Sequence, residues 1–454
     1  MNKKAAALMI AFSMCLTASC STGSVTETSA ESIAETSAET AAETTSGTTA
    51  ETTEATTAAT TAETTEETWP EDRYIPFASG NGFSLIEEGY GTEVTDQQSG
   101  TCWAHAAATA LESNYLLTNG ENIDVVPNDI VYATYGRIGV SDPDRDGFHA
   151  MIYSMYNVGG GPDQVMAGIS NGLDGGIVLT NTMRYDNCSR EEMQEALRTY
   201  GAFSIGYLDA SDEYYEIYGY TTLNNHSTWS DHAVTVVGYD DDFPAEYFDP
   251  PAQSNGAWLV QNSFSERWGD GGYFWLSYET GFDEPMSLTG SYDYSYVLSY
   301  DGANTRWIVR GGTVSLANVF EYEGTLGAVG TYTADEGQEV TVRIYDGELT
   351  DGELLAEVTE EFEYPGYHTL VLDEPIEVST FTIVAEYERS APVEGDSREN
   401  YYGDSYIRFA GSSEPGQSYI LLDGEWVDLS SEGITTVLYT DFLPNNACIK
   451  ALFI

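Results

Sequence analysis

The chain has 454 residues, which is enough for two folded domains with tails, and 41% of its residues are hydrophobic. Its formal net charge of −58 arises from 74 acidic residues against 16 basic ones. Such a surface repels phosphate groups, and no cluster of Lys or Arg reverses the sign locally. The composition therefore argues against a nucleic-acid-binding protein.

Residues 1–20 have the pattern of an export signal. Lys3 and Lys4 precede an apolar stretch that is too short to span a bilayer comfortably. Small residues then precede Cys20, so the segment resembles the lipobox of bacterial lipoproteins, although Thr17 stands where Leu is usual. We expect an exported protein with a lipid on Cys20, held on the outer face of a bacterial cytoplasmic membrane; plain cleavage is the alternative.

Residues 21–68 consist almost entirely of Thr, Ala, Ser and Glu. Such a segment buries too little apolar surface to offset the entropy that it loses on ordering. We therefore expect a disordered, self-repelling stalk. Globular composition begins near Phe77.

Helical and strand periodicities mix between residues 77 and 285, which predicts an α+β domain. A helix is expected over 102–117, and apolar runs predict buried strands over 232–238, 257–261 and 272–278. The expected buried face of the helix carries Trp103, Ala106, Ala107, Ala110, Leu111 and Asn114.

Residues 290–454 show short aromatic and β-branched runs, separated by turn residues such as Asp423-Gly424. This pattern predicts an antiparallel β-sandwich without helices. Strands are expected over 341–345, 368–372, 380–387, 406–409, 419–422 and 435–439. The Trp and Tyr side chains there are expected in the core and on sheet faces, with a sugar-binding platform as the alternative.

Cys102 is the candidate nucleophile. It opens the expected helix, where the aligned N–H dipoles lower the pKa of a thiol. Gln97 or Gln98, a few residues upstream, could add a side-chain donor to an oxyanion hole. Outside the signal only Cys188 and Cys448 remain besides Cys102, too few for a disulfide framework. Those two could form one disulfide or stay separate thiols.

His232 is the candidate base, because it opens an apolar strand far downstream of Cys102. Asn262 follows a later strand, and its amide could accept a hydrogen bond from the imidazole and hold its tautomer. His105 is a competing base, because it lies three residues after Cys102 on the same helix.

Together these segments resemble the papain (C1) family of cysteine peptidases, in the family's order and over about residues 77–285. The matching segments are 96–97, 100–104, 231–234, 260–263 and 267–273. Gly159-Gly160 also resembles the Gly-Gly stretch that lines the family's substrate cleft.

The resemblance implies a two-lobed papain-like domain in which Cys102 is the nucleophile and His232 the base. It also implies that Asn262 orients the imidazole and that Gln97 is the oxyanion donor. By the same resemblance, the substrate cleft includes Gly159, Gly160, Asp231 and Trp268.

The sequence departs from the family at several positions. Ser99 stands where many members have a disulfide cysteine, and an acidic insertion over 240–254 lengthens the segment before Asn262. Phe264 replaces the Trp that commonly shields the His–Asn hydrogen bond, and it is expected to do similar work. The C-terminal region resembles the lectin-like domain of some bacterial members, most clearly over 446–451.

The sequence thus predicts an exported peptidase that hydrolyses peptide bonds and needs no metal or organic cofactor. The negative charge favours neutral or basic peptide substrates. A papain fold kept only as a binding or adhesion module is the main alternative, and acyl transfer to an amine is another. The C-terminal domain could bind a cell-surface glycan. Asp142, Asp144 and Asp146 have the spacing of a calcium loop, but Tyr153 replaces the final Glu, so a solvated turn is favoured.

Overall fold

The computed structural model describes residues 81–454, apart from 99, 136–161, 174–175, 210–212, 228, 303–305, 396, 402–404, 410 and 439–443. Several predicted features lie outside the described residues: the export signal with Cys20, the stalk over 21–68, Ser99, Gly159, Gly160, and the turn with Asp142, Asp144 and Asp146. None of the described helices is long and apolar enough to cross a membrane.

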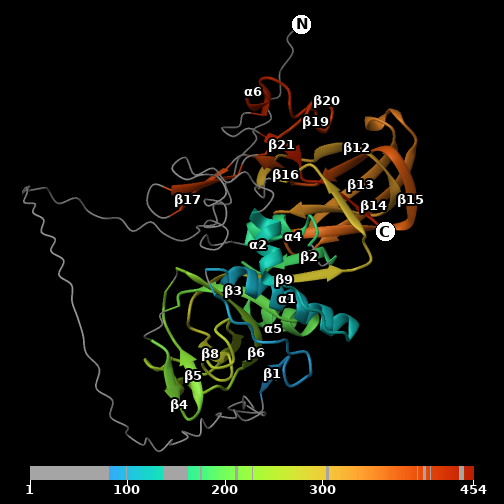
Figure 1. Cartoon of the computed structure of the whole chain (residues 1–454). Helices are drawn as coiled ribbons and strands as arrows, with labels where there is room; N and C mark the ends of the chain where they lie inside the picture. The colour runs from blue at the N-terminus through green and yellow to red at the C-terminus, as the bar shows by residue number, and fades with distance from the viewer. Residues whose placement is uncertain are drawn as a thin grey trace, which may run out of the picture. The chain divides into compact units, whose positions relative to one another are not determined.

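The N-terminal region combines helices with a largely antiparallel sheet (Figure 1). Its helices are α1 (Cys102–Asn119), α2 (Pro127–Tyr135), α4 (Pro162–Ile169), α5 (Arg190–Tyr200) and the short 3-10 helix η1 (Ala245–Tyr247). Its strands are β1 (Gly82–Ser84), β2 (Val178–Arg184), β3 (Phe203–Tyr207), β4 (Tyr215–Ile217), β5 (Tyr220–Leu223), β6 (His232–Asp240), β7 (Ala257–Gln261), β8 (Tyr273–Ser277) and β9 (Phe282–Ser291). The predicted helix and the three predicted strands of this region are confirmed as α1, β6, β7 and β8.

Helix α1 packs on one face of the sheet formed by β6, β3 and β9. All six side chains of its predicted inner face are buried, so the helical period was correctly identified. Thr235 in β6 donates a hydrogen bond from its hydroxyl to the carbonyl of Ala106, 3.3 Å away. The helix ends at Gly120, whose φ of 71° lets its N–H close on the Leu116 carbonyl. The opposite face of the sheet is covered by an aromatic core that includes Trp258 and Trp275.

The C-terminal region consists mainly of strands. They are β10 (Tyr296–Ser299), β11 (Arg306–Arg310), β12 (Val314–Thr333), β13 (Gln338–Asp346), β14 (Leu354–Phe362), β15 (Gly366–Tyr387), β16 (Ser390–Gly395), β17 (Ser397–Tyr401), β18 (Ser405–Phe409), β19 (Ser418–Leu422), β20 (Glu425–Asp428), β21 (Pro444–Ala447) and β22 (Lys450–Phe453). Two short helical segments accompany them, η2 (Leu349–Asp351) and α6 (Ile434–Leu438).

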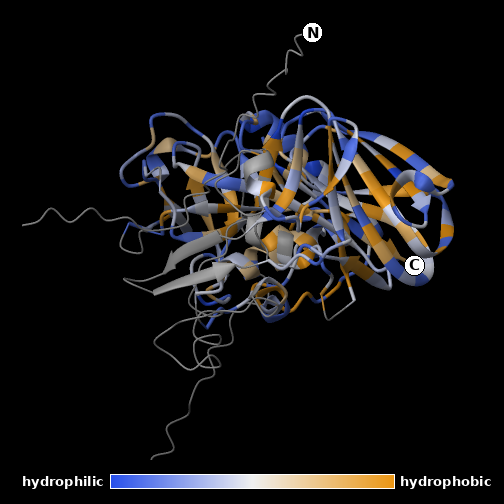
Figure 2. Ribbon diagram, turned by 90° about the horizontal axis from the view of Figure 1, so that it is seen from above, coloured by the Kyte–Doolittle hydropathy of each residue, from blue (hydrophilic) through white to orange (hydrophobic). Residues whose placement is uncertain are grey.

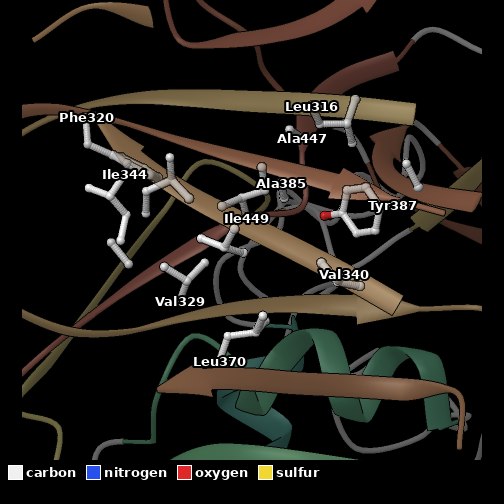
Figure 3. Close-up of a cluster of buried hydrophobic side chains, with 14 of the residues drawn as sticks. Leu316, Phe320, Val329, Val340, Ile344, Leu370, Ala385, Tyr387, Ala447 and Ile449 are labelled. Atoms are coloured by element: carbon white, nitrogen blue, oxygen red, sulfur yellow. The ribbon is translucent and has the colours of Figure 1, made fainter. Parts of the chain in front are cut away.

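The long strands β12 and β15 pair antiparallel and enclose the apolar core of this region. Figure 3 shows side chains from several strands meeting in that core, among them Phe320, Ile344 and Ile449. Polar and apolar residues alternate along the strands that bound it, as the hydropathy colouring shows (Figure 2). In β14 the exposed residues alternate with half-buried ones, as expected for a strand with one face toward the core.

Two details of the predicted strand pattern are wrong. The strands expected over 368–372 and 380–387 belong to the single strand β15. The strand expected over 435–439 is replaced by helix α6, which overlaps it. Ile434 and Leu438 are both buried, and residues four apart share a face in a helix as well as in a strand. The turn at Asp423-Gly424 is confirmed, because both residues have positive φ and join β19 to β20.

Strand β2 connects the two regions. It pairs with β9 on one side, and its Asn181 pairs with His368 of β15 on the other. The hydroxyl of Thr182 also accepts a hydrogen bond from the Tyr367 N–H at 2.7 Å. Tyr367, Tyr332 and Cys448 of the C-terminal region share one apolar cluster with the buried face of α1. The apolar cluster behind the helix that begins at Cys102 thus extends into the β-rich region.

Candidate active site

Cys102 is the first residue of α1 and is half-buried. The N–H groups of Ala104 and His105 both bond to the carbonyl of Thr101, as at the start of a helix. The sulfur accepts hydrogen bonds from the N–H groups of Trp103 and Ala233. The helix start and strand β6 therefore both direct donors at the sulfur.

His232 is the first residue of β6 and is buried, with 7% of its surface exposed. Its Nε2 lies 2.9 Å from Oδ1 of Asn262, and its side chain also hydrogen-bonds to Cys102. The N–H of Ser263 donates to the same Asn262 oxygen at 2.8 Å. The N–H of Asn262 in turn donates to the Gly272 carbonyl at 2.8 Å. The structure thus brings the predicted sulfur, imidazole and amide together in one row.

Burial and mutual attraction oppose each other in this pair. Burial by itself raises the pKa of the Cys102 thiol, but the hydrogen bond and charge of His232, with the two backbone N–H groups, outweigh it and lower the pKa. Burial likewise lowers the pKa of His232, but Cys102, Asn262 and Asp209 outweigh it and raise the pKa. Both shifts favour a thiolate beside an imidazolium, which is the reactive form of a cysteine nucleophile.

Aromatic rings surround the imidazole. Phe264 stacks on His232 with ring centres 4.8 Å apart and an angle of 17°, and Trp268 meets Phe264 edge-on at 5.6 Å. On another side, Tyr207 lies 5.8 Å from His232, and its hydroxyl hydrogen-bonds to that of Tyr214. Tyr214 completes the ring by meeting Trp268 edge-on at 5.0 Å. Phe264 thus lies against the imidazole, and His232 and Asn262 are both buried.

The sequence analysis missed Tyr207 and Tyr214. The sequence offers one signal for Tyr207, the alternation of large apolar residues along the strand that it ends, β3. The structure adds that Tyr207 pairs in register with His232. Tyr214 comes from a loop and donates a hydrogen bond to Asp209 at 3.0 Å, which no local pattern indicates.

The two candidate oxyanion donors differ in position. Gln97 is half-buried, and its Oε1 accepts a hydrogen bond from the Ser263 hydroxyl at 2.5 Å. Its N–H also donates to the Ser263 carbonyl at 2.8 Å, so the loop before Cys102 is fixed to the segment after Asn262. Gln98 is exposed, and its Nε2 donates to the carbonyl of Asp96 at 3.1 Å.

His105 is a poorer candidate for the base than His232. Its Nδ1 lies 2.7 Å from the Thr95 hydroxyl, and burial lowers its pKa to about 4 although Asp96 opposes the shift. Asp231 is exposed, and its Oδ1 accepts a hydrogen bond from the Asp209 N–H at 2.8 Å.

No disulfide joins Cys188 to Cys448. Within the part of the chain that the structure describes, no group of three or more His, Cys, Asp or Glu side chains is placed to hold a metal ion.

Two sequence families match this chain. Residues 174–289 match the family described as "Papain family cysteine protease", and residues 296–452 match the "Lectin like domain". The chain therefore contains a papain-family cysteine peptidase domain followed by a lectin-like domain. The first match includes His232 and Asn262, whereas Cys102 lies before it.

Individual relatives resemble this chain in one or both regions. "Digestive cysteine proteinase 3" of Homarus americanus is 29% identical over 201 residues, which are 41% of this chain and 58% of that protein. Cathepsin L of Sarcophaga peregrina is 29% identical over 202 residues, which are 41% of this chain and 56% of that protein. The chain thus spans little more than half the length of these relatives.

Two solved structures resemble both regions. The clostridial cysteine protease Cwp84 after propeptide cleavage has a TM-score of 0.65 at 19% identity, over 82% of this chain and 99% of that one. The protease and lectin-like domains of Cwp84, a surface layer associated protein of Clostridium difficile, give 0.62 at 20% identity, over 82% and 88%. At this identity the likeness shows the fold, a papain-like catalytic domain with a β-rich lectin-like domain.

Proposed function

We propose that this protein is an exported cysteine peptidase that hydrolyses peptide bonds through a thioester on Cys102. The observation that carries the proposal is the row formed by Cys102, His232 and Asn262, in which each side chain hydrogen-bonds to the next. Three side chains from three separate elements meet with the charges that nucleophilic catalysis requires.

The Cys102 thiolate attacks the carbonyl carbon of the peptide bond, and the electron pair moves to the oxygen. The developing oxyanion is stabilised by the Cys102 N–H and by the side-chain amide of Gln97. The bond to nitrogen then breaks as the His232 imidazolium gives its proton to the leaving amine. A water molecule, deprotonated by His232, attacks the thioester, and the acid leaves as the Cys102 thiolate is restored.

Gln97 suits the role of oxyanion donor better than Gln98. Gln97 is half-buried in the loop that leads to Cys102, and its carbonyl oxygen accepts a hydrogen bond from the Ser263 hydroxyl. Gln98 instead uses its donor nitrogen on the carbonyl of Asp96. Asn262 orients the imidazole through its oxygen. Asp231 directly precedes His232 in the chain, and Trp268 packs edge-on against Phe264, which stacks on His232.

The proposed setting is the outside of a bacterial cell. The N-terminal signal and Cys20 support export with a lipid anchor, and the stalk would hold the folded part away from the membrane. Protein or peptide substrates follow from the proposed chemistry. A glycan partner for the lectin-like domain is a weaker proposal, supported by the family match alone.

Labelling with an epoxide or vinyl-sulfone peptide tests the proposal against an inactive papain-like adhesion module. Such probes bond covalently to an activated thiolate, so we expect one label per chain, on Cys102, as located by mass spectrometry. Cys188 is the internal control, because its pKa is raised to about 11 and it should stay unmodified. A folded protein that takes no label on Cys102, or that cleaves peptides after Cys102→Ala, would contradict the proposal.

A further inference from the structure

A chain of hydrogen bonds runs from Asp209 to the ring that lies beside His232. Tyr214 donates from its hydroxyl to Oδ1 of Asp209 at 3.0 Å, and the hydroxyls of Tyr214 and Tyr207 hydrogen-bond to each other. Tyr207 is fully buried and pairs in register with His232, and the centres of the two rings are 5.8 Å apart. The chain therefore links a carboxylate in the loop after β3 to the surroundings of the candidate base.

The carboxylate fixes the direction of both hydroxyl groups in this chain. Burial is the main cause that holds the pKa of Tyr207 and that of Tyr214 well above their usual range, so both hydroxyls keep their protons. Tyr214 gives its single hydroxyl proton to Asp209, so Tyr207 has to be the donor to Tyr214. Asp209 thus orders two buried polar groups that would otherwise have no defined orientation.

The backbone of Asp209 is attached to the residue that precedes His232. Its N–H donates to Oδ1 of Asp231 at 2.8 Å, and the N–H of Asp231 donates to the Tyr207 carbonyl at 3.0 Å. Asp231 is exposed, whereas Asp209 is half-buried. Because water and salt screen an exposed charge more strongly, Asp209 is the carboxylate that acts on the imidazole, and it raises the pKa of His232.

The other titratable or charged groups on the elements around His232 do not replace this carboxylate. They are Asp96, Cys102 and His105 around the start of α1, Asp231 before β6, and Glu266 and Arg267 after β7. His105 is neutral because burial lowers its pKa to about 4. Asp96, Asp231, Glu266 and Arg267 are all exposed. Apart from the Cys102 thiolate itself, Asp209 is therefore the anion that acts on the imidazole.

We propose that Asp209 is a positioning residue of this site, whose carboxylate stabilises the protonated form of His232. Through the two tyrosines it also holds in place the ring that lies beside the imidazole. This inference rests on the proposed peptidase function and adds a residue that acts on the base from outside the catalytic row. In the thioester the Cys102 sulfur carries no charge, so Asp209 remains as the anion near His232 when the imidazole takes a proton from water.

The test uses the full chain and Asp209→Asn, which removes the charge but keeps an oxygen that can accept from Tyr214. Without the carboxylate His232 loses its proton at lower pH, so the alkaline limb of the pH profile should move to lower pH. For a fluorogenic peptide we expect kcat/KM within about 2-fold of the wild type at about pH 6, but about 3-fold or more lower at about pH 9. Asp209→Glu, which keeps the charge, should restore part of the activity at the higher pH.

Glu213→Gln is the matched control, because it removes one negative charge from an exposed position in the same loop. It should change the ratio of kcat/KM between the two pH values by less than about 1.5-fold. Tyr214→Phe separates the chain from the charge, since it removes the hydroxyl that fixes the carboxylate and keeps the ring. It should move the alkaline limb in the same direction as Asp209→Asn, but by less.

A second measurement does not depend on catalysis. The chain has 5 histidines, so the ring signal of His232 can be assigned in NMR spectra by its loss in His232→Ala. That signal should titrate at lower pH in Asp209→Asn than in the wild type. The inference is overturned if the titration is unchanged, or if Asp209→Asn lowers kcat/KM by the same factor at both pH values. A wild type that cleaves no peptide would contradict the proposed function itself, whereas the titration would still report on Asp209.

Discussion

Two buried histidines, one in each region of the molecule, are stacked on phenylalanine rings, yet their pKa values move in opposite directions. His232 stacks on Phe264 at 4.8 Å, and its pKa is raised because Cys102 outweighs the effect of burial. His368 in β15 stacks on Phe362 at 4.0 Å, and burial lowers its pKa to about 3. Its side-chain partner is the hydroxyl of Thr333, 3.0 Å from Nε2, which carries no charge. An anion, and not burial or stacking, decides which histidine becomes a cation.

The pKa values of the cysteines also depend on a neighbouring charge, but here a cation favours the charged form. His232 lowers the pKa of Cys102, whereas burial and nearby carboxylates, Glu192 and Glu336 first, raise that of Cys188 to about 11. Since the chain has 74 acidic residues, a thiol placed without a cation is surrounded by groups that keep it protonated. Of these two cysteines, only Cys102 faces an imidazole, and only its surroundings favour a thiolate.

The largest expected effect comes from removing the cation of the reactive pair. His232→Ala should lower kcat/KM for peptide hydrolysis by about 10³-fold or more, because the thiolate loses its partner and the leaving amine its acid. His105→Ala is the control, because His105 lies three residues after Cys102 on α1. This variant should change kcat/KM by less than about 3-fold. The measurement is steady-state hydrolysis of a fluorogenic peptide. Activity lost in His105→Ala but kept in His232→Ala would reverse the two roles.

A second buried cation extends the comparison to the contact between the two regions. Lys450 of β22 is fully buried, and its Nζ lies 2.7 Å from Asp301 and 3.1 Å from the side-chain oxygen of Asn171, which follows α4. Like His232, it has an anion beside it. It also joins the lectin-like region to the region that carries the candidate site.

Lys450→Met should lower the free energy of unfolding by about 3–5 kcal/mol, because it leaves the buried Asp301 without its cation. Urea unfolding followed by tryptophan fluorescence measures the change. The double variant Lys450→Met with Asp301→Asn should recover part of the loss, because no lone charge remains. A single variant as stable as the wild type would show that this ion pair does not hold the regions together.

Much of the site could be predicted from sequence because its parts are marked locally. The helix at Cys102 and the apolar strands at His232 and before Asn262 have clear periods. The helix begins at Cys102, β6 begins at His232, and β7 ends one residue before Asn262. The resemblance to papain-like peptidases indicated that Cys102, His232 and Asn262 act together. Local patterns could not supply contacts between distant segments, such as Asn171 with Lys450 or Gly206 with Asp283.

The error in β15 has a similar cause. Asp373, Glu374 and Pro375 look like a turn, and the sequence analysis divided the strand there. In the structure these residues have no partner in β12, so the strand passes through an unpaired stretch where Pro costs no ladder hydrogen bond. Only the register of the neighbouring strand reveals that the chain continues in one direction.

The smallest expected effect concerns His368, and it would sharpen the comparison of the two histidines. Its folded pKa of about 3 lies below the ordinary value of about 6.5, so the unfolded chain takes up a proton between those values and the folded protein does not. The free energy of unfolding should therefore fall as the pH drops below about 6.5, with this residue contributing about 2 kcal/mol of the loss at pH 5. His368→Gln removes the titrating group, so the difference between wild type and variant should shrink by that amount from pH 7 to pH 5 in urea unfolding. If the difference stays constant, His368 keeps an ordinary pKa, and burial beside a phenylalanine is not enough to hold an imidazole neutral.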